Sequence, residues 1–170
     1  YGGACFPKDV QALMHAGDEV GIDMRLLAEV EARNARQKNL LFEKLFLYFG
    51  GELKGKKIAV WGLAFKPGTD DIREAPSIQL IRSVLEAGVS VSAYDPKAKA
   101  ATEKIFSTSV LSKNIEFYED QYSALEDVDA LILVTEWKRF RSPDFVGMRQ
   151  RMRGRLILDG RNQYDPEMLS

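Results

Sequence analysis

Hydrophobic residues recur at two different spacings along the chain, and the spacing changes near Gly50. Up to that point the apolar positions repeat every three or four residues, which is the period of an amphipathic helix. The pattern predicts a first helix from Pro7, a residue suited to the first helical turn, to about Gly21. It predicts a second helix over about residues 24–49, one side of which carries Leu27, Val30, Asn34, Leu41, Leu45 and Tyr48.

The second predicted helix is longer than an average globular helix of about 11–12 residues. Glu29 and Arg33 lie four residues apart and are expected to form an ion pair on its surface. Because the following domain cannot cover the whole apolar side, we expect this helix to form a homodimer. Asn34 on that side fits the polar position that sets the register of a helix pair.

Beyond Gly51, apolar runs of strand length alternate with helical patterns. The run Ala130–Val134 is uninterrupted, as in parallel strands that are buried on both faces. Strands are predicted over residues 56–62, 89–94, 115–118, 130–134 and 156–158, with helices over 77–85, 98–106 and 122–125 and around 145–152. This alternation predicts an α/β fold with a doubly wound, Rossmann-like parallel sheet. We expect a helical dimerisation segment over residues 1–52 and an α/β domain over residues 53–170.

The composition is that of a folded globular protein and excludes disorder. Of 170 residues, 45% are hydrophobic and 29% are charged, and the net charge is −1. A chain this neutral is not built as a whole to bind nucleic acid or an anionic membrane. Residues 138–155 carry seven basic side chains and one acid. Because no stacking aromatics are interleaved with them, they indicate a solvated helix face rather than a nucleic-acid surface.

No targeting or anchoring segment is recognisable. The chain has no apolar run long enough to cross a membrane and no signal-peptide pattern. Its single cysteine cannot form an internal disulfide, so we expect a cytoplasmic protein. Because the sequence starts at Tyr1, without Met and inside a glycine-rich loop, we expect a fragment of a longer chain.

A candidate nucleophile precedes the first predicted helix. Backbone N–H groups and the positive end of the helix dipole lie beside the sulfur of Cys5, and Lys8 adds a cation. Both effects favour the reactive thiolate. Asp9 can reach the same side, and Gly2 and Gly3 allow a substrate to approach the backbone closely. On spacing alone the alternative, an inert and buried cysteine, stays open.

The loop after the first predicted strand, Gly62–Arg73, is not a dinucleotide-binding G-x-G-x-x-G turn, because Ala64 replaces the second glycine. Asp95 could imitate the acidic ribose ligand of such a site, but a strand-ending Asp-Pro turn is the favoured interpretation. Phe65 and Lys66, residues 135–137 and residues 159–162 each follow a predicted strand. In a doubly wound sheet the carboxyl ends of these three strands border the ligand crevice. The ring and cations there suit a phosphorylated, base-bearing ligand.

Two long motifs resemble those of the UDP-glucose/GDP-mannose dehydrogenase family. The segment Gly2–Val10 is similar to the family's catalytic cysteine motif, and Trp61–Ser77 is similar to its second long signature. Tyr94–Pro96, Thr135–Trp137 and Asp159–Arg161 follow in the expected order. The resemblance implies a central helical region that forms the dimer and a C-terminal UDP-sugar domain. It also implies that an N-terminal NAD-binding domain, with a catalytic Lys and Asn, is missing from this chain.

The resemblance also implies roles for individual residues. Cys5 would be the catalytic nucleophile, and Asp9 would order or activate water. Lys8 and Arg73 would contact NAD. The UDP-sugar would be contacted by Gly2, Phe65, Lys66 and Arg161.

The implied reaction oxidises the C6 alcohol of UDP-glucose to UDP-glucuronate with two NAD, through a Cys5 thiohemiacetal and thioester. No metal is expected, and without the NAD-binding domain we expect this chain alone to be inactive. Phe6, directly after the cysteine, favours UDP-glucose over GDP-mannose as the substrate. A GDP-mannose 6-dehydrogenase and a non-catalytic nucleotide-binding dimerisation module remain the alternatives.

Overall fold

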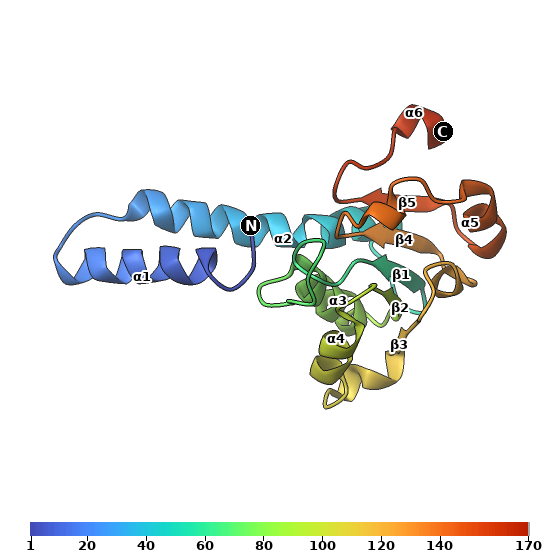
Figure 1. Ribbon diagram of the computed structural model, residues 1–170, viewed down its shortest axis with the longest axis horizontal. Helices are drawn as coiled ribbons and strands as arrows, with labels where there is room; N and C mark the ends of the chain where they lie inside the picture. The colour runs from blue at the N-terminus through green and yellow to red at the C-terminus, as the bar shows by residue number, and fades with distance from the viewer. Residues whose placement is uncertain (170) are drawn as a thin grey trace.

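Two helices form a hairpin that projects from an α/β domain in the computed structural model, which describes residues 1–169 (Figure 1). Helix α1 spans Phe6–Glu19 and helix α2 spans Arg25–Tyr48, so both helices begin and end close to their predicted limits. The chain reverses at Gly21, whose φ of 72° lies in the left-handed region that favours glycine. We call the part of this hairpin that lies outside the α/β domain the arm.

The five predicted strands are all present and form one parallel sheet. They are β1 (Lys57–Trp61), β2 (Ser90–Tyr94), β3 (Ile115–Phe117), β4 (Ala130–Leu133) and β5 (Leu156–Asp159). Their order is β3-β2-β1-β4-β5, so β1 lies at the centre, between β2 and β4. This order confirms the predicted doubly wound α/β fold and places the carboxyl ends of β1, β4 and β5 side by side.

Helices cover the sheet on both faces. The helices α3 (Pro76–Glu86), α4 (Lys99–Phe106) and α5 (Phe145–Arg151) and the C-terminal half of α2 pack around it, whereas the short helix α6 (Pro166–Leu169) lies beyond β5 (Figure 1). Ile58 and Val60 of β1 point into the core beneath α2 and α3, whereas Ala59 and Trp61 point into the core beneath α5. The helix expected over residues 122–125 is a 3₁₀ turn at Ser123–Leu125, and two further 3₁₀ turns, Val110–Asn114 and Lys138–Phe140, were not predicted.

The C-terminal half of α2 corrects the expected dimer face. Leu45 is fully buried, and Leu41, Phe42 and Phe49 pack against the core between α3 and the sheet. The assignment of Leu45 to a dimer interface was therefore wrong, whereas that of Leu41, which is only partly buried, stays a prediction. Tyr48 on the predicted side is 59% exposed. The division of the chain at residue 52 remains a prediction, since the end of α2 lies in the core of the domain that follows.

Two polar assignments on α2 are also corrected. Glu29 pairs with Arg36 at 2.5 Å, and not with the expected partner Arg33. The side chain of Asn34 binds the backbone of Tyr1 within the same chain, so its expected role in a helix pair between two copies was wrong.

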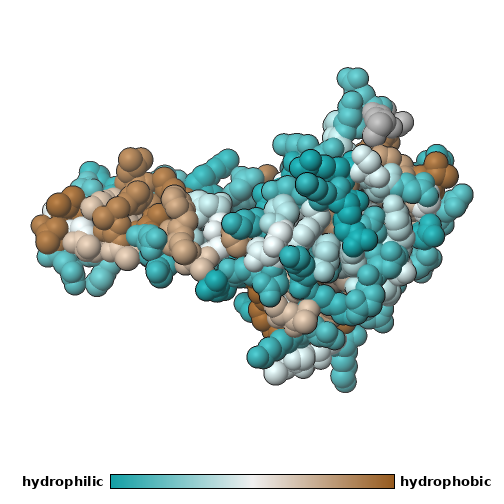
Figure 2. All heavy atoms as spheres, in the orientation of Figure 1, coloured by the Kyte–Doolittle hydropathy of each residue, from teal (hydrophilic) through white to brown (hydrophobic). Residues whose placement is uncertain are grey.

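The arm nevertheless carries an exposed apolar surface. Large apolar side chains that are at least 40% exposed lie on both helices and their connection: Phe6, Leu13, Val20, Ile22, Leu26 and Val30. Figure 2 shows apolar residues concentrated on the arm and hydrophilic residues over most of the visible α/β domain. Across residues 1–169, no helix is both long enough and apolar enough to span a membrane.

Candidate active site

Cys5 lies at the end of the glycine-rich loop, directly before α1. Its thiol is exposed to solvent. Its carbonyl oxygen accepts a hydrogen bond from the backbone N–H of Asp9 at 2.9 Å, so the residue belongs to the first turn of the helix. This exposure contradicts the interpretation of Cys5 as a small buried hydrophobic residue.

The two charged residues that follow Cys5 interact with each other. The ammonium group of Lys8 lies 3.5 Å from the carboxylate of Asp9, and both side chains are largely exposed. The carboxylate therefore balances part of the positive charge that the sequence places beside the sulfur. A surface pair of this kind contributes little to stability, so both groups can rearrange around a ligand.

A second loop, residues 62–75, connects β1 with α3 and carries Arg73. The guanidinium donates hydrogen bonds to both carboxylate oxygens of Asp71, from Nε at 2.9 Å and from Nη2 at 2.7 Å. These hydrogen bonds lower the pKa of Asp71. The same contact raises the pKa of Arg73, and the negative charge of a Cys5 thiolate adds to the increase.

The cysteine loop and the 62–75 loop are in direct contact. The backbone N–H of Gly3 donates a hydrogen bond to the carbonyl oxygen of Arg73 at 3.0 Å. A Cβ atom on Gly3 would lie 2.8 Å from the ring of Phe65, and one on Gly2 would lie 2.5 Å from the carbonyl oxygen of Glu74. The two glycines are therefore required for close packing of the loops, which brings together Gly2, Cys5, Phe65 and Arg73.

Phe65 and Lys66 lie in the loop after the carboxyl end of β1, where the sequence predicts the ligand crevice. The ammonium of Lys66 lies 5.2 Å from the centroid of the Phe65 ring, within the range of a cation–π interaction. The hydroxyl of Thr135, directly after β4, donates a hydrogen bond to the carbonyl oxygen of Ala64 at 2.5 Å. This bond ties the loops after β1 and β4 together beneath the crevice.

Arg161 follows β5 on the same side of the sheet. Its Nε donates a hydrogen bond to the carbonyl oxygen of Val134 at 2.6 Å and lies 3.0 Å from the carboxylate of Glu136. The side chain is about two-thirds buried, so the guanidinium is held in one orientation. The predicted neighbourhood of the strand ends of β1, β4 and β5 is confirmed, whereas the role of Arg161 in binding a sugar nucleotide stays a prediction.

Asp95 stabilises the turns around this crevice. It is almost completely buried, with 3% of its surface exposed. Its Oδ2 accepts hydrogen bonds from Leu63 N, Ala64 N and Trp137 Nε1, and its Oδ1 accepts from Lys97 N and Ala98 N. Both oxygens are thus occupied by the protein, which favours the Asp-Pro turn over a ribose ligand.

Sequence reasoning missed several residues that hold the site loops. Ser77 in α3 donates from its hydroxyl to the carbonyl oxygen of Leu63 at 2.5 Å. Lys38 of α2 binds Glu74, and Asn39 of α2 accepts a hydrogen bond from Gln79. Of these, only Ser77 has a local signal, because a hydroxyl directly after the Pro of a helix start is expected to bond to backbone. The others lie about 36–40 residues apart in sequence.

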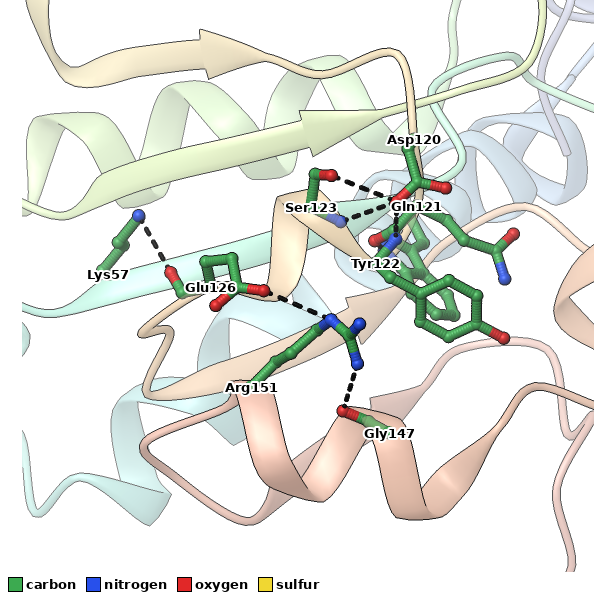
Figure 3. Close-up of polar contacts among 9 residues, drawn as sticks. Lys57, Asp120, Gln121, Tyr122, Ser123, Glu126, Gly147 and Arg151 are labelled. Atoms are coloured by element: carbon green, nitrogen blue, oxygen red, sulfur yellow. Dashed lines mark hydrogen bonds and ion pairs between the residues drawn. The ribbon is translucent and has the colours of Figure 1, made fainter.

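Three cations of the basic segment are used within the protein. Arg151 donates a hydrogen bond to the carbonyl oxygen of Gly147 at 2.9 Å and lies 3.2 Å from the carboxylate of Glu126 (Figure 3). Arg153 binds Asp129 through two hydrogen bonds, at 3.0 and 2.7 Å. Arg139 donates to Gln121 and Tyr94. These contacts show that part of the basic segment links elements within the α/β domain.

The described part of the chain, residues 1–169, contains no cluster of three or more His, Cys, Asp and Glu side chains that could bind a metal ion.

Comparison with known proteins identifies the family. Residues 59–166 match the UDP-binding domain of the UDP-glucose/GDP-mannose dehydrogenase family, and residues 1–36 match its central domain. The chain is 51% identical over its whole length to a UDP-glucose 6-dehydrogenase of Pseudomonas aeruginosa, of which it covers 38%. It is 37% identical over 96% of its length to a UDP-glucose 6-dehydrogenase of Rhizobium meliloti, of which it covers 36%.

A solved structure of a UDP-glucose dehydrogenase from Pyrobaculum islandicum superimposes with a TM-score of 0.81 and 32% identity, over 95% of this chain and 34% of that one. The chain belongs to the UDP-glucose/GDP-mannose dehydrogenase family, as the motifs predict. It spans between one third and two fifths of the length of these relatives.

Proposed function

We propose that the chain is the central and C-terminal part of an NAD-dependent UDP-glucose 6-dehydrogenase. The observation that carries this proposal is the contact between the cysteine loop and the 62–75 loop, in which Gly3 N–H donates to the Arg73 carbonyl oxygen at 3.0 Å. An exposed thiol is thereby held beside a crevice whose border includes an aromatic ring and cations. The relatives named UDP-glucose 6-dehydrogenase support UDP-glucose as the substrate.

Within this proposal, Cys5 is the nucleophile of the second half of the reaction. After the C6 alcohol has been oxidised to an aldehyde, the thiolate adds to the carbonyl carbon and forms a C–S bond. Oxidation of the resulting thiohemiacetal gives a thioester, and water then replaces the sulfur to release the carboxylate. Asp9, in the first turn of the same helix, is the residue we assign to ordering or activating that water.

Lys66 and Phe65, together with Gly2 and Arg161, are the residues we assign to the sugar nucleotide. Arginine and lysine bind phosphate through charge-assisted hydrogen bonds, and an aromatic ring stacks on a base. Gly2 is assigned to the substrate through its place in the glycine-rich loop, and the same residue packs tightly against the 62–75 loop, where a Cβ atom would lie 2.5 Å from the carbonyl oxygen of Glu74. The fixed guanidinium of Arg161 offers a binding group at little further entropic cost.

NAD accepts hydride when bound, and the described residues fit one side of its site. Lys8, in the first turn of α1, and Arg73, in the 62–75 loop, are exposed cations, which suit a pyrophosphate. The sheet crevice itself does not fit a dinucleotide. Both oxygens of Asp95 are occupied, and a Cβ on Gly62 would lie 2.5 Å from Thr135. We therefore assign the remaining NAD contacts to a domain outside this chain.

The exposed apolar surface of the arm supports a homodimer as the partner arrangement. We place the interface on the N-terminal half of α2, at Leu26 and Val30, together with α1, because these side chains are exposed on the arm, whereas Leu45 in the C-terminal half is buried in the α/β domain. A second copy of the same surface would remove these side chains from water.

The substrate is tested by titration calorimetry of this chain with UDP-glucose and with GDP-mannose. We expect UDP-glucose to bind more tightly, and the variant Lys66→Ala to lose about tenfold or more in affinity through one missing charge-assisted contact. The matched control is Lys104→Ala, which removes an exposed lysine from α4, on another part of the domain. Tighter binding of GDP-mannose would favour the related GDP-mannose activity. Equal binding by the two lysine variants would refute the crevice as the sugar-nucleotide site.

Catalysis by the thiol is tested with iodoacetamide. A reactive Cys5 is alkylated at neutral pH, and bound UDP-glucose should slow the reaction. An inert thiol with unchanged nucleotide binding would instead indicate a non-catalytic nucleotide-binding and dimerisation module.

A further inference from the structure

One face of α2 contacts both loops of the candidate site. Asn34 and Lys38 are four residues apart, so they lie one above the other on this helix. Asn34 binds the segment that leads into the cysteine loop, and Lys38 binds the end of the 62–75 loop. No described hydrogen bond or ion pair joins either residue to Cys5 or to the crevice residues.

Asn34 holds the backbone on both sides of one residue. Its Nδ2 donates a hydrogen bond to the carbonyl oxygen of Tyr1 at 3.1 Å, and its Oδ1 accepts one from the N-terminal ammonium group of Tyr1 at 2.7 Å. This contact joins α2 to the segment before the cysteine loop. It fixes the residue directly before Gly2, so the start of the cysteine loop cannot rotate away from α2.

Lys38 holds the second loop through an ion pair. Its ammonium lies 2.7 Å from the carboxylate of Glu74, and only 12% of the lysine side chain is exposed. Glu74 has a φ of 52°, a left-handed conformation that costs a non-glycine residue free energy and persists only when its surroundings hold it. The largely buried ion pair supplies such a constraint, at the residue whose carbonyl oxygen faces Gly2.

We infer that Asn34 and Lys38 are positioning residues, which hold the cysteine loop and the 62–75 loop against each other. This inference rests on the proposed function, because the consequence of holding the two loops together is that the thiol of Cys5 is aligned with Phe65 and Lys66, the residues assigned to the sugar nucleotide. The bond between Gly3 N–H and the Arg73 carbonyl oxygen reports on this alignment, since it crosses from one loop to the other.

The test is hydrogen exchange of the Gly3 amide, measured by NMR in this chain. The variants Asn34→Ala and Lys38→Met each remove one anchor, and the methionine keeps most of the length of the lysine side chain. We expect the Gly3 amide to exchange about tenfold faster in both, which corresponds to about 1.4 kcal/mol. The conservative variant Lys38→Arg retains a cation for Glu74 and should restore slow exchange.

The matched control is Arg36→Met, on the same helix. It removes the ion pair with Glu29, in which both side chains are mostly exposed. Its Gly3 exchange should equal that of the unchanged chain. The positioning role of Lys38 is refuted if the Gly3 amide exchanges no faster in Lys38→Met than in this control, or if Lys38→Arg fails to restore slow exchange. The positioning role of Asn34 is refuted if exchange of the Gly3 amide is unchanged in Asn34→Ala.

A second measurement separates this inference from the proposed function. The affinity for UDP-glucose is determined for the same variants by calorimetry. Faster Gly3 exchange in a chain that does not bind UDP-glucose at all would support the loop anchors and contradict the proposed substrate. Normal exchange and normal affinity in the anchor variants would contradict the anchors and leave the substrate proposal standing. Faster exchange together with a several-fold weaker affinity supports both.

Discussion

Replacing Asp95 with Asn tests whether one buried carboxylate stabilises the crevice. The carboxylate accepts five hydrogen bonds at 2.7–3.1 Å, three on Oδ2 and two on Oδ1. An amide group keeps one acceptor oxygen and turns the other side into a donor. In Asp95→Asn at least two N–H groups therefore lose their acceptor and face an NH₂ group instead.

The expected loss follows from these contacts. A hydrogen bond to a charged group contributes about 1.5–3 kcal/mol, so two lost bonds cost about 3–6 kcal/mol. A domain of this size is stable by about 5–15 kcal/mol, so Asp95→Asn should remove a large part of the total. At about 2–4 °C per kcal/mol, the melting temperature should fall by roughly 10 °C or more.

Urea denaturation followed by circular dichroism measures this loss as a lower midpoint with an unchanged slope. The control is Asp70→Asn, which makes the same chemical change at an exposed position of the loop between β1 and α3 and should shift stability by less than about 0.5 kcal/mol. An equal midpoint for the two variants would refute the assignment of Asp95 as the residue that stabilises the crevice turns. It would also remove our argument against a ribose at this position.

Three further outcomes are expected. Gly3→Ala should destabilise the cysteine loop by about 1–2 kcal/mol, because φ is 86° and the added methyl group would overlap an aromatic ring; local hydrogen exchange measures the effect. Burial raises the pKa of Tyr164, so its phenol stays protonated in the folded chain at a pH near 10, where the phenol of the unfolded chain ionises. The free energy of unfolding should therefore fall above about pH 10 in the parent chain and fall less in Tyr164→Phe, which urea midpoints measured against pH would show. Leu26→Glu should convert a dimer into a monomer in sedimentation experiments at micromolar concentration, whereas a parent chain that is already monomeric would contradict the dimer proposal.

The sheet could be predicted from the sequence because its signal is local. Strands buried on both faces have uninterrupted apolar runs, such as Ala130–Val134, and Gly, Pro or Asp residues mark their ends. The strand order then follows from the general rules for doubly wound sheets. The crevice residues Phe65, Lys66 and Arg161 could be placed on one side of the sheet for the same reason, since each directly follows a strand.

The function of the long helix could not be predicted in the same way, because periodicity shows which side is apolar and not what covers it. Leu27 and Leu45 repeat on one side of α2, yet Leu45 is covered by the sheet domain and Leu27 lies on the arm. The change of partner occurs near the middle of the helix, where no break in the sequence pattern marks it. Asn34 was misread for this reason, since the group that it binds, Tyr1, is distant along the chain.

Positive φ at three positions coincides with a close approach between two segments of the chain. Gly3, Gly62 and Glu74 all have positive φ, and each lies where one loop approaches another closely. Glycine adopts this conformation without a steric penalty, so the first two positions need no compensation. Glu74 does, and it is the residue that Lys38 binds. A loop held in this way is ordered before a ligand arrives, so less of the binding free energy is lost in ordering it.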